Sequence, residues 1–427
     1  MKKLLIILGA GSSIPIGMPS VADLDARMFD WSDTWSPAPG LDNYYRAIWA
    51  GVEQYYAASP DSIKPRPNFE KVLGEMVGLA HWMTPSPLGN AMRQLIAPGG
   101  SPIGMRFQMG PYAATVGLDD QLTHLLIQLA KHMRELCKGG AVTRHPNFTN
   151  YKALFDRLRE RFDVGVFNLN YDNAALTAIP GAFTGFASSG RFDAVQMHGR
   201  EDWGFVYHLH GSIHHDLEHP FGNRINWLDD LNGLFFDGHI ASSRDMRSDN
   251  RLFPKTSLIA GGFKLDQLLA EPFHSLYAAL IRRVYEADAI LVGGYGFGDT
   301  HVNRALQNRL GVVGPRPPVM VLTRTSDRMP IEFRNDEWGH KLTLALQAPS
   351  QYREPGHAAP PDIDELIAKN GFEVSSPHQV AIWHGGFVEA TRRLDAIVDW
   401  LDSKTDDSVL AGETAAAGSH RSENGTR

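Results

Sequence analysis

The sequence predicts an α/β protein built on a doubly wound, mostly parallel sheet with a helical insertion. Two observations predict this class. The first is a set of short apolar runs typical of strands that are buried on both faces, at 4–8, 164–169, 204–209, 289–292 and 318–322. The second is that segments with helical spacing of apolar residues lie between these runs. Strands that alternate with helices in this way form parallel sheets.

The remaining elements follow from periodicity and composition. Segments expected to be helical are 21–28, 44–56, 69–82, 122–136, 148–162, 265–280, 387–401, a stretch after 172 and a stretch from about 301. Two further runs, 192–197 and 342–346, are predicted as strands, the second because its leucines alternate. Stretches rich in proline, glycine or polar residues are predicted as loops, at 30–40, 84–117 and 217–254.

The order of these elements predicts how the chain is divided. Segment 41–150 holds helices and loops without a convincing strand, so we expect a helical insertion after the first strand and helix. The main domain is expected over 1–325. An α/β extension over 326–402 is expected to offer a surface for an oligomer or a partner. Residues 403–427 are small, polar and charged, which predicts a disordered tail.

Composition excludes several classes of protein. With 43% hydrophobic and 21% charged residues, the 427-residue chain is neither disordered nor fibrous. Its net charge of −7 argues against a broad basic face, so direct nucleic-acid binding is not expected. No stretch reaches the roughly 18 to 20 apolar residues that span a membrane, and the first apolar run is too short for a secretion signal.

The single cysteine, Cys137, narrows the chemistry further. One thiol can form neither an internal disulfide nor a zinc site that uses several cysteines. A chain without disulfides is typical of the cytoplasm, which is therefore the expected compartment.

A glycine-rich turn follows the first predicted strand, with the sequence Gly9-Ala10-Gly11-Ser12-Ser13. Glycines let the backbone approach a phosphate, and the start of a following helix offers free N–H groups. The third glycine of the dinucleotide fingerprint would stand at position 14, where this chain has isoleucine. This argues against an ordinary Rossmann dehydrogenase, and a tight turn that serves packing alone is the alternative.

Polar residues also follow two other predicted strands. Asn170 and Asp172 come directly after 164–169, and His210 comes after 204–209. At the carboxyl end of a parallel strand such residues face the ligand crevice. Asn170 is suited to hold a hydroxyl group or a water. Asp172 is suited to bind a carboxamide or only to cap the next helix, and His210 is a candidate general base or a structural histidine.

Two further patterns need an interpretation. Histidines are dense between 198 and 219, but the chain has no H-E-x-x-H pattern, and zinc would need three ligands from separate elements, so no metal is expected. The second pattern places glycines at alternate positions before Asp299. They let the backbone approach a ligand, whose ribose hydroxyl Asp299 would bind. A packing turn with Asp299 as a helix cap is the alternative.

Taken in this order, the motifs resemble those of the sirtuin-like superfamily, and most closely its bacterial, defence-associated branch that hydrolyses NAD. The opening motif of that family is similar to the glycine turn followed by Gly17-Met18-Pro19-Ser20. Its Asn-x-Asp, His-Gly and late glycine motifs resemble Asn170-Tyr171-Asp172, His210-Gly211-Ser212 and Gly294-Tyr295-Gly296-Phe297-Gly298-Asp299. A helix start found in the branch's insertion is similar to Asn68-Phe69-Glu70.

The resemblance implies a Rossmann-like fold and an NAD glycohydrolase that releases nicotinamide and ADP-ribose. Asn170 would orient the ribose or the attacking water, and His210 would act as the base. NAD would be the substrate, with no zinc. The residues expected to bind it are Gly9, Ala10, Gly11 and Ser12 at the pyrophosphate, Asp172 at the carboxamide, Tyr295 and Asp299 near the adenosine half, and also Pro19 and Gly294.

Alternatives stay open beside this function. One is a catalytically silent sensor of NAD or ADP-ribose, and another is a zinc-free protein deacylase. Against the deacylase, the family's deacylating members carry a zinc module with two cysteine pairs, which this chain lacks. A second His-Gly pair, His198-Gly199, leaves His198 as an alternative base.

The resemblance also implies a biological setting. Members of the branch are regulated effectors of antiphage defence that act by depleting NAD. A homo-oligomer is therefore expected, together with a defence partner such as a DNA-translocating ATPase or a short Argonaute.

Overall fold

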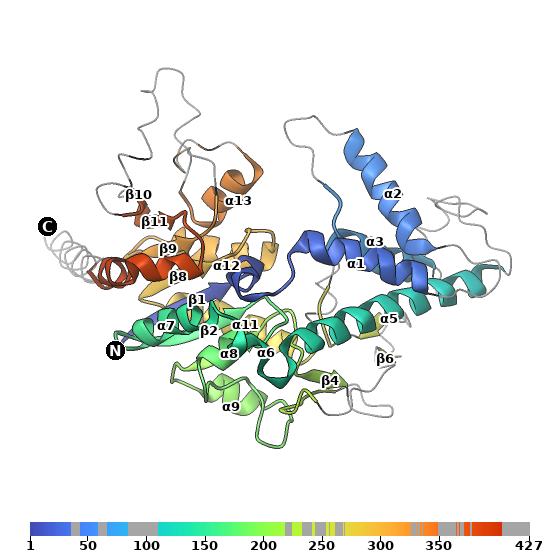
Figure 1. The fold of residues 1–427 in the computed structure, drawn as a ribbon, viewed down its shortest axis with the longest axis horizontal. Coiled ribbons are helices and arrows are strands. Elements are labelled where there is room, and N and C mark those ends of the chain that lie inside the picture. The colour runs from blue at the N-terminus through green and yellow to red at the C-terminus, as the bar shows by residue number, and fades with distance from the viewer. Residues whose placement is uncertain are drawn as a thin grey trace, which may run out of the picture.

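The structure is a computed structural model. It describes residues 1–35, 43–58, 66–83, 110–217, 224–232, 241–243, 253–255, 257–260, 268, 270–325, 330, 334, 336–348, 364, 367, 371–375 and 378–403. The centre of the fold is a seven-stranded sheet with the order β10-β11-β9-β8-β1-β2-β3 (Figure 1). These strands are β1 (Lys2–Leu8), β2 (Phe162–Asn168), β3 (Phe205–His208), β8 (Ala289–Gly293), β9 (Val319–Leu322), β10 (Glu373–Ser375) and β11 (Val380–Trp383).

Neighbouring strands of this sheet run parallel, except that β10 is antiparallel to β11. Two small antiparallel ladders lie outside it. They pair β4 (His215–Leu217) with β5 (Ile225–Trp227), and β6 (Ala241–Ser243) with β7 (Phe253–Lys255). The predicted fold class, an α/β protein with a mostly parallel sheet, is confirmed.

β1 lies at the middle of the sheet, between β2 and β8. Its apolar run is fully buried because both faces of the sheet are covered by helices. Leu4, Ile6 and Leu8 pack into one core cluster, and Leu5 and Ile7 pack into the other. This alternation is the period of two expected for a strand.

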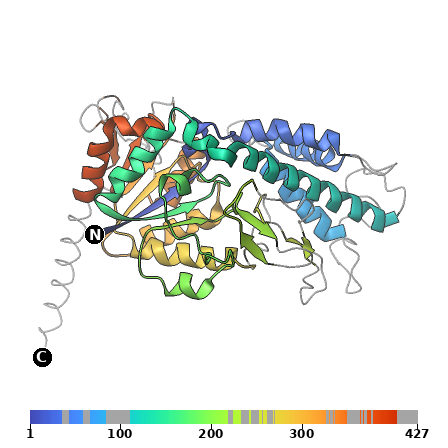
Figure 2. The ribbon, with the colours of Figure 1, turned by 60° about the horizontal axis from the view of Figure 1, so that its bottom comes forward.

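Helices cover the two faces as Figure 2 shows. One face packs against α7 (Phe148–Arg159), the 3₁₀ helix η8 (Val388–Arg393) and the helix formed by 394–403. The other packs against α11 (Phe273–Glu286), α12 (Thr300–Leu310) and α13 (Glu337–Ala345). Shorter helices are α6 (Ala141–Arg144), α8 (Ala174–Ala178) and α9 (Ala194–Gly199).

Four helices between β1 and β2 form a unit beside the sheet, which we call the helical arm (Figure 1). They are α1 (Val21–Thr34), α2 (Tyr44–Ala57), α3 (Phe69–Met83) and α5 (Gly110–Cys137). The apolar side chains of the arm are continuous with the cluster on one face of the sheet. A capping box starts α1, because Ser20 accepts from Asp23 N and the Asp23 carboxylate accepts from Ser20 N.

Two predicted strands are wrong. Residues 192–197 contribute to α9, where Asp193 caps the helix by accepting from Gln196 N at 2.8 Å. Residues 342–346 contribute to α13 and the turn after it. There Leu342, Ala345 and Leu346 are buried, with the spacing of a helix, while Leu344 is 50% exposed. The alternation of leucines at 342, 344 and 346 therefore indicated the two-residue period of a strand, whereas the buried residues follow the period of a helix.

Other boundaries also shift. α1 continues to Thr34 into the predicted loop 30–40, and α5 begins at Gly110, ahead of the first regular leucine. In the predicted helix 265–280, the helix begins only at Phe273, after Pro272.

The predicted tail lies outside the described residues from 404 onwards. The predicted domain limits stay a prediction, although 326–402 adds β10 and β11 to the central sheet. Within the described ranges, no helix has the length and apolar character of a membrane span.

A glycine in β2 tests this packing. A Cβ at Gly165 would lie 2.3 Å from Cζ of the buried Phe205 ring. Gly165→Ala should therefore lower the free energy of unfolding by about 1–3 kcal/mol through overpacking. The measurement is the midpoint of urea unfolding. Gly51→Ala in α2 is the control, because among the described residues no atom beyond its chain neighbours and the adjacent backbone of its own helix lies within 4 Å of its added Cβ, and it should raise stability by about 0.5–1 kcal/mol. Equal effects from both variants would contradict the packing argument.

Candidate active site

The turns that follow β1 and β8 pack backbone against backbone. Gly9 N donates to Gly293 O at 2.9 Å, and Gly11 N donates to Gly294 O at 2.9 Å. A Cβ on Gly9 would lie 2.7 Å from Tyr295 Cα, and a Cβ on Gly11 would lie 2.9 Å from Gly294 Cα. The space that these glycines leave free is filled by the neighbouring turn. The glycines are therefore needed for packing, and pyrophosphate binding by Gly9, Ala10, Gly11 and Ser12 stays a prediction.

Gly294 is the tightest point of this contact. Its φ of +59° is in the left-handed region, and a Cβ there would lie 2.0 Å from Ser12 N. After the turn the backbone forms two short 3₁₀ helices, Ala10–Ser12 and Ile14–Ile16, before α1 begins. The helix predicted to begin at Val21 begins there, after these two turns.

Asn170 connects the end of β2 to the glycine turn. Its Nδ2 lies 3.0 Å from Gly9 O, 3.2 Å from Ser12 Oγ and 2.9 Å from Ser13 Oγ. These contacts fix the plane of the amide. Among the described residues, none donates a hydrogen bond to its Oδ1. Asn170 thus presents a fixed amide whose oxygen is available as an acceptor.

Asp172 is buried two residues further on, at 1% exposure. Its Oδ1 accepts from Ala174 N at 2.9 Å, at the first turn of α8, and the Ser13 hydroxyl donates to the carboxylate. Burial raises the pKa of Asp172 above its usual range. The capping role considered for this residue is present, and its contact with a carboxamide stays a prediction.

A cavity of about 80 Å³ lies beside these residues. Its walls come from the turn after β1, from the end of β2 and from α1, α3 and α5 of the helical arm. Among the predicted site residues, it is lined by Ala10, Pro19, Asn170 and Asp172. Its other lining residues are Ser13, Met18, Val21, Leu24, Phe69, Glu70, Met133, Leu169 and Tyr171. The cavity is thus shared between the sheet and the arm.

His210 and Asp299 meet above the sheet. His210 follows β3 and Asp299 follows β8, and β1 and β2 lie between these two strands. Even so, His210 Nε2 is 2.7 Å from Asp299 Oδ2, with the side chains 8% and 3% exposed. The segments after β3 and β8 therefore arch over the ends of β1 and β2, where Asn170 lies.

Asp299 has further partners around this contact. Its Oδ1 caps α12 by accepting from His301 N at 2.8 Å and Val302 N at 3.2 Å. Tyr277 Oη donates to Asp299 Oδ2 at 3.4 Å. Tyr295 Oη accepts from Asp299 N at 2.9 Å, while the Tyr295 backbone contacts Gly9. Tyr295 thus joins the His210 group to the glycine turn.

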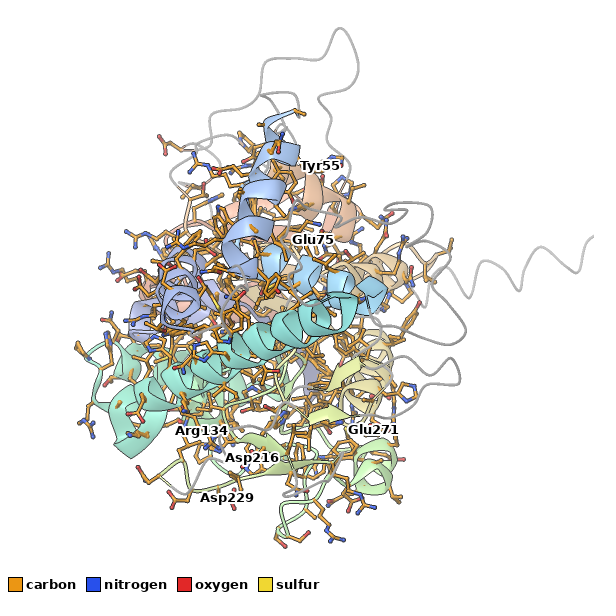
Figure 3. All side chains as sticks on the ribbon, turned by 90° about the vertical axis from the view of Figure 1, so that its right-hand side faces the viewer. Tyr55, Glu75, Arg134, Asp216, Asp229 and Glu271 are labelled. Carbon is orange, nitrogen blue, oxygen red and sulfur yellow. The ribbon has the colours of Figure 1, made fainter. Side chains whose placement is uncertain are left out.

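The turn after His210 requires glycine for two reasons. Gly211 has a φ of +89°, and a Cβ on it would lie 2.3 Å from Ser257 O. The approaching segment is held by a hydrogen bond from Ile259 N to His210 O at 2.8 Å. Figure 3 labels Arg134 on the arm. Its Nε donates to Ile213 O at 2.7 Å, so the segment that follows His210 is also held from the side of the arm.

The alternative base, His198, lies elsewhere. It belongs to α9, and its ring Nε2 is 3.0 Å from Ser275 Oγ of α11. The structure therefore groups His210, and not His198, with Asp299 and Tyr295. Within the described ranges, no three histidine, cysteine or carboxylate side chains are arranged to hold a metal.

Two contact residues were not anticipated. Ser13 is the last residue of the predicted glycine-rich turn but was not among the predicted binding residues, and it contacts both Asn170 and Asp172. Its position in the turn was a signal that could have included it. Tyr277 lies on α11 and reaches Asp299 from there. A single tyrosine on an amphipathic helix carries no such signal, since most are core residues.

The fold and this edge together define an α/β protein of the doubly wound, Rossmann-like class. Its polar groups gather at the carboxyl ends of β1, β2, β3 and β8, where proteins of this class bind ligands. Residues 164–343 match the family model of the SIR2-like domain. The matched segment is similar to domains of the sirtuin-like superfamily. It includes Asn170, Asp172, His210 and Asp299, while the first glycine turn lies outside it.

Two other comparisons do not extend the result from the family model. Comparison with curated proteins gave no match. Among solved structures, a mutant Sir2 homologue in complex with 2′-O-acetyl ADP-ribose is similar, with 13% identity and a TM-score of 0.31 over 83% of this chain and 95% of that one. Backbones that agree at this level diverge too far for the likeness to support a statement about this chain.

Three histidines pack around Trp227 near the site: His208, His214 and His215. The ring of His214 stacks on Trp227 with centroids 4.6 Å apart. Burial lowers the pKa of His208 and of His215 to about 3. Both are neutral at physiological pH, and the His208 Nδ1–H donates to Asn170 O at 3.1 Å. They serve packing and the support of Asn170.

This burial predicts acid sensitivity. The unfolded chain binds protons near pH 6.5 at these positions, while the folded chain does not until about pH 3. Stability is therefore lost as the pH falls below about 6.5. Each of the two histidines should lower the free energy of unfolding by about 2 kcal/mol between pH 7 and pH 5.

The test is His215→Phe, which keeps a ring beside Phe186 and Trp227. The loss of urea stability between pH 7 and pH 5 should shrink by about 2 kcal/mol in this variant. His340→Phe is the control, because the exposed His340 meets solvent in both states. An unchanged pH dependence in His215→Phe would show that His215 is not buried as a neutral group.

Proposed function

We propose that the protein is an NAD glycohydrolase that cleaves NAD to nicotinamide and ADP-ribose. The observation that carries the proposal is the fixed amide of Asn170, held by Gly9 O, Ser12 and Ser13 at the wall of a cavity within a SIR2-like domain. An acceptor oxygen held at that place suits a ribose hydroxyl or the attacking water.

The reaction breaks the bond between C1′ of the ribose and the ring nitrogen of nicotinamide. The electron pair of that bond returns to the ring nitrogen, and nicotinamide leaves as a neutral molecule. The ribose passes through an oxocarbenium-like state, and a water oxygen bonds to C1′. One water proton goes to His210 and then to solvent. Groups that stabilise the cationic state more than the substrate accelerate this step.

The described residues suit these roles. Asn170 Oδ1 would hold the ribose hydroxyl or the water, and Asp172 would contact the carboxamide, since both line the cavity. Glu70 lines the cavity from the arm side, and its carboxylate would favour a cationic ribose. Gly9, Ala10, Gly11 and Ser12 would face the pyrophosphate. Gly294 and Tyr295 stand next to this turn, and Asp299 N donates to Tyr295 Oη.

Water, rather than an acylated lysine, would be the acceptor. The zinc module of deacylating sirtuins needs cysteine pairs, whereas this chain has Cys137 alone. Cys137 is buried in the arm, and burial raises the pKa of its thiol to about 12. A thiol held protonated in this way is a poor metal ligand. The roles in antiphage defence, homo-oligomer formation and partner binding stay predictions from the resemblance.

The experiment is to incubate the protein with NAD and to quantify nicotinamide and ADP-ribose. Asn170→Ala and His210→Ala should each lower the rate at least about 100-fold, since each removes a group acting on the reacting atoms. Each variant should remain folded, as checked by thermal unfolding.

Matched controls come from the same regions. Asn147→Ala removes an amide that donates to Pro15 O at 2.8 Å from outside the cavity. His198→Ala removes the alternative base. Both variants should keep the rate of the unaltered protein. Loss of activity in His198→Ala but not in His210→Ala would transfer the role of base to His198, and absence of NAD binding by calorimetry would overturn the proposal.

A further inference from the structure

We propose that Asp299 is a positioning residue that fixes the ring of His210 so that Nδ1, rather than Nε2, accepts the proton from water. The inference rests on the proposed function and names the atom that performs its base step. The binding role expected for Asp299 from the sequence stays a prediction, and the contact that the structure shows is between its carboxylate and His210.

The two oxygens of Asp299 have separate tasks. Oδ1 is occupied by the N–H groups of His301 and Val302 at the start of α12, which orients the carboxylate. Oδ2 then lies 2.7 Å from His210 Nε2. A carboxylate only accepts hydrogen bonds, so Nε2 carries the proton in this contact. In the neutral ring the lone pair is consequently on Nδ1.

Burial strengthens this arrangement. The side chains of His210 and Asp299 are 8% and 3% exposed, so their interaction is little screened by water. When Nδ1 takes a proton, the ring becomes positive next to a negative carboxylate. The same logic explains how an aspartate orients a catalytic histidine and stabilises its charged form in hydrolytic triads. Asp299 thus favours the product of the proton transfer without contacting the substrate.

The surrounding backbone places His210 near Asn170. Leu209 N donates to Asn168 O at 2.9 Å, and His208 Nδ1 donates to Asn170 O at 3.1 Å. The segment that carries His210 is thereby held against the segment that carries Asn170. The contact between His210 and Asp299 closes this arch from the side of β8. The competing explanation is that the contact between His210 and Asp299 only holds the two segments together and does not orient a base.

Asp299→Asn separates the two explanations. Asparagine is an equally good helix cap, so its Oδ1 can keep the bonds to His301 and Val302. Its NH₂ group would replace Oδ2 and donate to His210 Nε2, which forces the proton onto Nδ1. The lone pair on Nδ1 is lost at neutral pH. We expect kcat for NAD hydrolysis to fall about 100-fold or more, while KM and the thermal midpoint change little.

A matched control tests the helix cap alone. Asp193→Asn changes the same residue type at the N-cap of α9, where Asp193 accepts from Gln196 N. It should leave kcat, KM and the thermal midpoint unchanged. Tyr277→Phe removes the hydrogen bond that Tyr277 Oη donates to Oδ2 and leaves His210 in contact with the carboxylate. It should lower kcat much less than Asp299→Asn.

A second measurement does not depend on activity. In protein labelled with ¹⁵N-histidine, nuclear magnetic resonance should show the His210 proton on Nε2, and in Asp299→Asn on Nδ1. A proton on Nδ1 in the unaltered protein would overturn the inference even if the variant failed to fold. Joint loss of kcat, NAD binding and thermal stability in Asp299→Asn would also overturn it, in favour of a structural tie.

The two proposals fail in different ways. If the unaltered protein binds NAD but Asn170→Ala and His210→Ala hydrolyse it as fast, the proposed function is wrong at this site. If those variants are inactive and Asp299→Asn keeps the full kcat, the proposed function stands and the role of Asp299 is overturned.

Discussion

The contact between the glycine turns after β1 and β8 determines how the rest of the site is arranged. Gly9, Gly11 and Gly294 allow the two backbones to approach to a separation that any Cβ would prevent. This approach brings the end of β8 beside the end of β1, and Asn170 then ties the end of β2 to the same turn. Three strand ends are thereby held as one rigid edge, on which the arch of His210 and Asp299 rests.

Much of this edge could be predicted because it depends on local sequence. Buried strands followed by glycines or polar residues are recognisable in one dimension, and the carboxyl ends of parallel strands meet at one edge by topology alone. The strands carrying Asn170, His210 and the two glycine turns were all identified for this reason. The helices of the arm were recognised from apolar spacing, since each buries one stripe.

What could not be predicted depends on contacts between distant segments. No sequence feature shows that the segments after β3 and β8 arch over two intervening strands, so the pairing of His210 with Asp299 was missed. The sequence also could not show that the space beside the glycines of each turn is filled by the backbone of the other turn. The two false strands have a different cause, because short apolar runs do not distinguish a period of two from one of 3.6 when few residues are sampled.

The cavity takes its walls from two parts of the chain. Phe69, Glu70 and Met133 belong to the arm, whereas Asn170 and Asp172 follow the sheet. A shift of the arm relative to the sheet would therefore change the shape of the cavity. It follows from thermodynamic linkage that a molecule preferring one position of the arm changes the affinity of the cavity for its ligand, and that the ligand changes the affinity for that molecule by the same factor. A molecule that binds the insertion would thereby act on the cavity from a surface that the sheet alone does not have.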